Sequence, residues 1–153
     1  MAPINEIVAG TALAAVRRGD DIRVYVTATN GDIREVRYHN GLWTGGTSVD
    51  CIVSGKVRSP LAATRCSLDV IHLFYVGSGN KLLEAYKKNN GWNNGSLGNL
   101  DAVLHPNSSL SAVRVGRAGE IRVYGQLPNC MIQEWQCRFY LCVLIDRVSS
   151  ASA

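Results

Sequence analysis

The sequence predicts an all-β fold built from short antiparallel strands that repeat along the chain. Apolar and polar residues alternate with a period of two, for example over residues 22–26, which is typical of a β-strand. Asn-Gly pairs at 30–31 and 40–41 separate such runs and favour tight hairpin turns. No stretch shows a clear helical period, so helices are not expected.

The pattern of the stretch 22–43 recurs twice. The second copy begins at Ile71, 49 residues after Ile22, and the third begins at Ile121, 50 residues after Ile71. Each copy places an Arg or His 12 residues before a Glu; the pairs are Arg23–Glu35, His72–Glu84 and Arg122–Glu134. Four short strands in a repeat of this length are typical of a β-propeller blade. We therefore predict a single domain over residues 1–153, with three four-stranded antiparallel blades at about 11–58, 59–107 and 108–148.

The composition excludes several classes of protein. Hydrophobic residues make up 46% of the 153 and charged residues 18%, which predicts a folded domain rather than a disordered chain. The net charge is +4, but the basic residues form no run, so we expect no nucleic-acid partner. The apolar run 12–16 is too short for a signal peptide, and no segment is long enough to span a membrane. We expect no membrane insertion, and a protein that is cytoplasmic or secreted without a leader.

Neither the cysteines nor the histidines show the spacing of a metal site. The five cysteines include no C-x-x-C pair, which argues against zinc and thioredoxin-type chemistry. We expect free or buried thiols in a reducing compartment. The three histidines are dispersed, so no metal and no cofactor is predicted.

The recurring Arg and Glu indicate a binding site. Across a hairpin, such a pair can face the same side of two adjacent strands. One isolated pair would be a surface ion pair that contributes little. In the first two copies, however, a Trp follows the Glu by 8 residues, at Trp43 and Trp92. A guanidinium, a carboxylate and an aromatic ring suit a sugar, because its hydroxyls bind the charged groups and its apolar face packs on the ring.

Several motifs recur in register with these residues. They are I-R-V-Y at 22–25 and 121–124, I/L-x-E at 33–35, 82–84 and 132–134, N-G-x-W or N-G-W at 40–43 and 90–92, and S-P-L-A-A at 59–63. From about residue 11 to residue 135 the chain resembles the fungal fucose-specific lectins of the Aleuria aurantia type. This resemblance implies a six-bladed propeller that binds L-fucose between blades. Arg and Glu come from one blade, and aromatic residues 3 and 8 positions after a Glu come from the next.

The resemblance implies a first fucose site made of Arg23, Glu35 and Trp92. Lys87 stands where the family often has a second aromatic residue, which weakens this wall. A second site would use His72 and Glu84. We expect it to be weak or inactive, because His lacks the forked guanidinium and because cysteines, Cys137 and Cys142, stand at the aromatic positions.

The third pair, Arg122 and Glu134, lacks a following blade in this chain. A homodimer would close a six-bladed ring and place Tyr38 and Trp43 of one chain beside this pair in the other. The alternative is a truncated or frame-shifted chain, which the loss of the repeat pattern after Trp135 favours.

We therefore predict a lectin, not an enzyme, that binds L-fucose on glycans or glycoproteins. The alternative is a truncated or degenerate lectin fragment that acts as a non-binding interaction module, because only three repeats are present. A propeller glycosidase is disfavoured, because each repeat offers one carboxylate and glycoside hydrolysis normally needs two.

Overall fold

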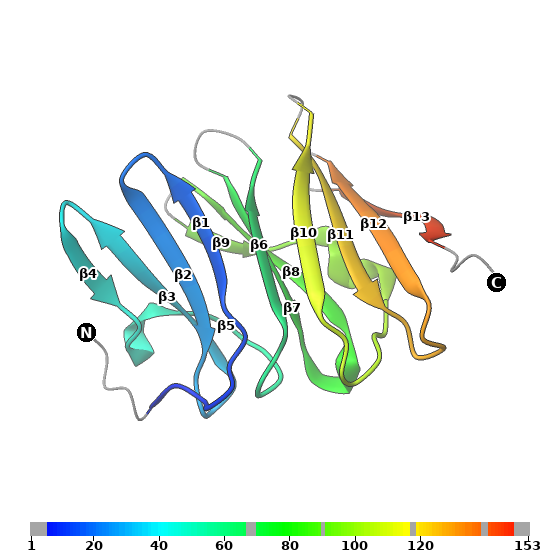
Figure 1. Cartoon of the computed structure of the whole chain (residues 1–153), viewed down its shortest axis with the longest axis horizontal. Coiled ribbons are helices and arrows are strands. Elements are labelled where there is room, and N and C mark those ends of the chain that lie inside the picture. Colours follow the sequence, from blue (N-terminus) through cyan, green and yellow to red (C-terminus); the bar gives the residue numbers. More distant parts are fainter. Residues whose placement is uncertain (1–5, 67–69, 90, 117–118, 139–140, 149–153) are drawn as a thin grey trace.

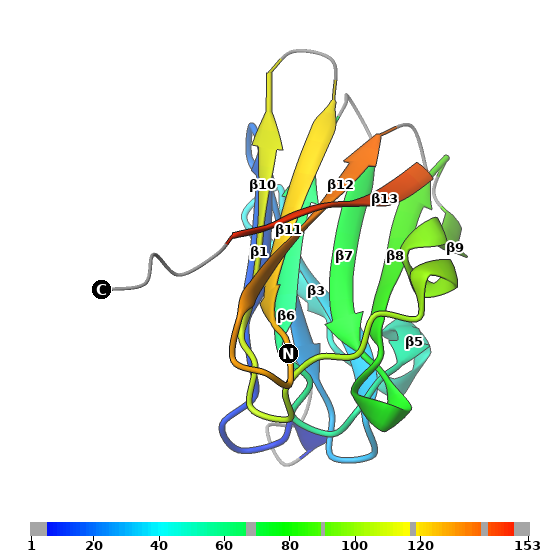
Figure 2. The same ribbon diagram turned by 90° about the vertical axis from the view of Figure 1, so that its right-hand side faces the viewer.

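The computed structural model describes residues 6–66, 70–89, 91–116, 119–138 and 141–148. These residues form three antiparallel sheets that stand side by side in chain order (Figure 1). Viewed from the C-terminal side, the sheets lie one behind another, with the third in front (Figure 2). The all-β prediction is confirmed. Within the described residues, no helix is both long enough and apolar enough to cross a membrane.

We call the three sheets the first, second and third blades. The first contains β1 (Ala14–Arg18), β2 (Asp21–Thr27), β3 (Asp32–His39), β4 (Leu42–Gly45) and β5 (Cys51–Ser54). The second contains β6 (Leu61–Arg65), β7 (Ile71–Val76), β8 (Leu82–Lys88) and β9 (Gly91–Asn94). The third contains β10 (Leu110–Val115), β11 (Glu120–Gln126), β12 (Ile132–Arg138) and β13 (Leu141–Val148). Short 3-10 turns, η2 (Ser48–Asp50), η3 (Ser78–Asn80) and η4 (Ser96–Leu100), lie in the connections.

Each blade has the four strands that the repeat predicts, paired in chain order. The first blade has one addition, because β5 pairs with β3 beyond the four-stranded path. The third blade corrects one inference from the sequence. Although the repeat pattern fades after Trp135, β13 pairs with β12 and completes the blade. The apolar residues of β13 can form a strand without the Asn-Gly turn that marks the earlier copies.

The predicted hairpin turns have a backbone that suits Asn and Gly. Asn40 and Gly41 both have positive φ, 50° and 81°, as a type I′ turn between β3 and β4 requires. Gly31 has φ of 90°, and a Cβ there would lie 2.8 Å from the Gly55 carbonyl oxygen. Asn89 also has positive φ, whereas Asn90 of the matching turn lies outside the described residues.

The hydrophobic core lies in two layers between the blades. The first and second blades share Tyr25, Ile33, Leu61, Leu73 and Ala85 among others. The second and third share Phe74, Leu82, Leu97, Val123 and Trp135 among others. Strand β7 is buried along its whole length because both neighbours cover the second blade. In contrast, β12 alternates between buried and more exposed residues, because no described blade covers its outer face.

Candidate functional site

The first predicted site begins on two adjacent strands of the first blade. Arg23 on β2 and Glu35 on β3 point to the side that faces the second blade. The Arg23 Nη1 atom donates to both carboxylate oxygens of Glu35, at 3.1 Å each. The Tyr25 hydroxyl, which is opposite Glu35 in the strand register, donates to Oε2 at 3.2 Å. The Glu35 carboxylate is therefore held in a fixed orientation between the blades.

The second blade supplies the other wall of this site. Trp92 on β9 packs edge to face against Tyr25, with ring centroids 5.8 Å apart. Lys87 on β8 donates from Nζ to Glu35 Oε1 at 3.1 Å and lies 5.7 Å from the centroid of the Trp92 ring. The fold thus brings together Arg23, Glu35 and Trp92, although they come from two blades and three strands.

The charges of the first site are partly buried and mutually compensated. Burial alone would lower the pKa of Arg23, but the carboxylates of Glu35 and Asp21 together outweigh burial and the pKa is raised. Asp21 accepts from Arg23 at 3.3 Å and from Arg37 at 2.8 Å. These contacts hold the pKa of Asp21 below its ordinary value, although burial opposes the shift. A sugar hydroxyl that binds Glu35 Oε1 has to share this oxygen with Lys87 or displace the ammonium.

Sequence reasoning missed two members of this site. Tyr25 and Asp21 flank Arg23 at two-residue spacing on β2, so all three side chains share one face of the strand. That spacing was the available signal, and the I-R-V-Y motif already contained Tyr25. The prediction for Lys87 was also incomplete. Lys87 stands in place of an aromatic residue, and in addition its ammonium donates a hydrogen bond to an oxygen of Glu35.

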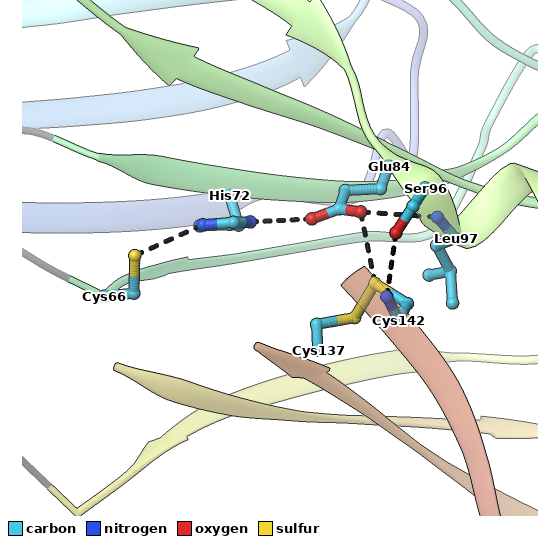
Figure 3. Close-up of a disulfide and its surroundings, with 7 residues drawn as sticks. All are labelled: Cys66, His72, Glu84, Ser96, Leu97, Cys137 and Cys142. Carbon is cyan, nitrogen blue, oxygen red and sulfur yellow. Dashed lines mark hydrogen bonds and ion pairs between the residues drawn. A yellow bond between two sulfur atoms is a disulfide. The ribbon is translucent and has the colours of Figure 1, made fainter. Parts of the chain in front are cut away.

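The second predicted site, between the second and third blades, is filled by protein. His72 Nδ1 on β7 lies 2.7 Å from Glu84 Oε1 on β8, and its Nε2 lies 3.2 Å from the Cys66 sulfur (Figure 3). The His72 and Glu84 side chains are only 4% and 0% exposed. Burial alone would lower the pKa of His72, but Cys66 and Glu84 together raise it to about 9.

The third blade closes this second site with a disulfide between Cys137 and Cys142. The Cys142 sulfur lies 3.3 Å from Glu84 Oε2, and the backbone N–H of Leu97 donates to the same oxygen at 3.4 Å (Figure 3). Gly95 also passes so close that a Cβ there would lie 2.1 Å from this oxygen. Glu84 therefore has little room for a sugar hydroxyl, which supports the prediction that this site is weak or inactive.

The disulfide corrects the expectation that all cysteines are thiols. Cys137 and Cys142 are directly opposite each other in the pairing of β12 and β13, with Cα atoms 4.0 Å apart. A spacing of five residues does not reveal such a pair until the hairpin register is known. Cys51 and Cys130 are exposed free thiols. A disulfide is more typical of an oxidising environment than of the reducing one inferred from the sequence.

The third pair repeats the first on an open face. Arg122 Nη1 contacts Glu134 Oε1, and its Nη2 contacts Glu120. Tyr124 is opposite Glu134 in the strand register, as Tyr25 is opposite Glu35. No blade among the described residues faces this pair, so only half of an inter-blade site is present.

The aromatic half-site lies at the other end of the row of blades. The rings of Tyr38 and Trp43 are 5.2 Å apart and tilted by 50°. They lie on β3 and β4 of the first blade, far from β12 in Figure 1. Trp43 remains 42% exposed. Within one chain, Tyr38 and Trp43 are therefore not brought to Arg122 and Glu134.

Comparison with known proteins places this geometry in a family. A sequence model described as "Fungal fucose-specific lectin" matches residues 7–139. The chain belongs to the fungal fucose-specific lectin family. A fucose-specific lectin of Aspergillus fumigatus is 37% identical over 134 residues, which cover 86% of this chain and 42% of the relative. The fucose-specific lectin of Aleuria aurantia is 35% identical over 123 residues, which cover 75% of this chain and 39% of that lectin.

Solved lectin structures have the same arrangement of blades. The SapL1 lectin in complex with α-methyl fucoside matches 95% of this chain, with a TM-score of 0.85 and 33% identity. The Aleuria aurantia lectin, described as a six-bladed β-propeller, matches 95% with a TM-score of 0.82 and 29% identity. The chain covers 49% and 51% of these two structures, respectively. The predicted propeller fold is therefore confirmed, because the three blades of this chain match half of a six-bladed propeller. The chain spans less than half the length of the curated relatives that it matches.

Proposed function

We propose that this chain is a carbohydrate-binding lectin that recognises L-fucose on glycans, with no catalytic role. One observation carries the proposal: Arg23, Glu35 and Trp92 meet between the first and second blades. The guanidinium offers donors, the carboxylate offers acceptors, and the indole offers an apolar surface to one face of the sugar. Relatives are named for fucose specificity, and the matched SapL1 lectin holds a fucoside.

In this proposal, each chain holds one complete fucose site, which lies between the first and second blades. The Arg122–Glu134 pair becomes a further site only when another blade faces it. A second copy of this chain could supply Tyr38 and Trp43 in a closed ring, and further blades of a longer protein could supply equivalent residues. Exposed apolar side chains on the third blade, including Val113, Val115, Leu141 and Val143, suit such packing.

Calorimetric titration with α-methyl-L-fucoside tests the proposal directly. We expect binding that free L-fucose competes away, and we expect Trp92→Ala to abolish it in a protein with one site per chain. If a second copy closes the ring, Trp43→Ala should lower the number of sites per chain and leave the first site intact. Light scattering of the same sample separates the two cases. A flat titration for a folded wild-type protein would refute fucose binding.

One observation favours the alternative, a degenerate lectin fragment that acts as a non-binding interaction module. Lys87 bonds the same Glu35 oxygen that a sugar hydroxyl would need. If this ammonium blocks the site, Lys87→Ala should bind the fucoside when the wild type does not. Equal and absent binding in both proteins would favour the interaction module.

A further inference from the structure

An open cleft of about 830 Å³ lies beside the first site, where the ends of strands from the first and second blades meet. It is lined on one side by the β1–β2 turn and the ends of β2 and β3, and on the other by the ends of β6, β7 and β8. Its lining is strongly basic, with five cationic side chains: Arg18, Arg23, Arg37, Arg65 and Lys87.

Two described carboxylates bond cationic side chains of the cleft. Asp21 lines the cleft and bonds Arg23 and Arg37. Glu35 bonds Arg23 and Lys87 from the adjoining sugar site. Of the described residues that line the cleft, five are cationic and one, Asp21, is acidic. Such a concave, basic surface attracts an anionic group.

Arg65 contributes a guanidinium to the lining of the cleft. It ends strand β6, and its Nε and Nη1 atoms are buried without a hydrogen-bond partner in the described structure. Buried donors normally have an acceptor, because leaving one unpaired is costly. A guanidinium binds carboxylate and sulfate groups through paired N–H donors. Arg65 also lies close enough to Tyr25 to counteract the rise in the pKa of that phenol, which places it near the sugar site.

We propose that this cleft is an anion subsite that binds a sulfate or carboxylate group on the same glycan as the fucose. The inference rests on the proposed fucose site. Arg23 and Lys87 take part in both, so one ligand can span the sugar site and the cleft. The preferred ligand is therefore an acidic fucosylated glycan, and Arg65 selects for the acidic group.

Calorimetry with four related oligosaccharides tests this subsite. They are a neutral fucosylated trisaccharide, its sulfated and its sialylated derivatives, and the sulfated sugar without fucose. A charge-assisted contact should make at least one acidic derivative bind about tenfold more tightly than the neutral parent. The gain should shrink as sodium chloride is raised, because salt screens exposed charges. A gain for one derivative alone identifies which acidic group the cleft takes.

Two arginine variants separate the subsite from a general charge effect. Arg65→Met should lower the affinity for the acidic derivative to that for the neutral parent. Arg114→Met is the matched control, because Arg114 holds the corresponding position on β10 of the third blade, and it should keep the full gain. Both variants change the net charge equally. Thermal unfolding of each variant confirms that it is folded.

Each remaining result contradicts a defined part of the argument. If the neutral trisaccharide binds and neither acidic derivative gains, the anion subsite is refuted and the fucose site stands. A gain that survives Arg65→Met refutes the role of this arginine in the subsite. Equal affinity for the sulfated sugar without fucose would refute the link between the two sites. If no fucosylated ligand binds, the proposed function itself fails.

Discussion

Glu35→Gln should weaken fucose binding more than any other single change of one charged group in the first site. The carboxylate accepts from Arg23 and Tyr25 and also from Lys87, and its side chain is only 14% exposed. Gln keeps the size of the side chain but removes the negative charge and replaces one acceptor oxygen with a donor nitrogen. Hydrogen bonds to charged groups contribute about 1.5–3 kcal/mol, so we expect the Kd to rise roughly 10- to 100-fold.

The matched control is Glu134→Gln on the third blade. Glu134 pairs with Arg122 as Glu35 pairs with Arg23, but no described blade faces it. Calorimetry should show no change in affinity if the chain is a monomer with one site, and a reduced number of sites per chain if a second copy completes the ring. Unchanged affinity in Glu35→Gln, with the variant folded, would refute the role of this carboxylate.

Three further predictions concern Lys87, His72 and the Cys137–Cys142 disulfide. Lys87→Tyr should tighten fucoside binding about two- to tenfold in calorimetry, because an aromatic wall replaces an ammonium that occupies Glu35; weaker binding would contradict this. The raised pKa of His72 means that the folded state holds the proton more tightly than the unfolded state. Its stabilisation, about 3 kcal/mol at most, is present below about pH 6.5 and lost as the pH rises through about 9. Urea unfolding should show this fall in wild type but not in His72→Gln. Reduction of the Cys137–Cys142 disulfide should cost about 2 kcal/mol of unfolding free energy and leave fucoside affinity unchanged.

The spacing of the repeats made much of the first site predictable. Ala28 and Asp32 close the hairpin around residues 29–31, and its register places Glu35 opposite Tyr25. Arg23 lies two residues before Tyr25 on the same face of the sheet, so a spacing of 12 makes Arg23 and Glu35 diagonal neighbours. The resemblance to the fungal fucose-specific lectins then implied that Trp92 faces the preceding blade. The structure has this arrangement for Trp92, which packs against Tyr25.

Features that depend on contacts between different repeats were not predictable in the same way. The Cys137–Cys142 disulfide depends on the register of a hairpin without a recognisable turn motif. The bond from Lys87 to Glu35 joins residues 52 apart, and its formation depends on how the two blades pack. The buried, unpaired nitrogens of Arg65 likewise result from blade packing and have no local sequence signal. Sequence periodicity predicts the strands and turns of each blade, whereas the side-chain contacts between blades depend on how the blades pack.

The most direct test of the central claim is a crystal structure of this chain with α-methyl-L-fucoside. We expect the sugar between the first and second blades, with its hydroxyls on Arg23 and Glu35 and its apolar face on Trp92. Lys87 should then have moved away from Glu35 or share its Oε1 with the ligand. A fucoside bound elsewhere, with the Lys87–Glu35 contact intact and no sugar against the Trp92 ring, would contradict the proposed fucose site.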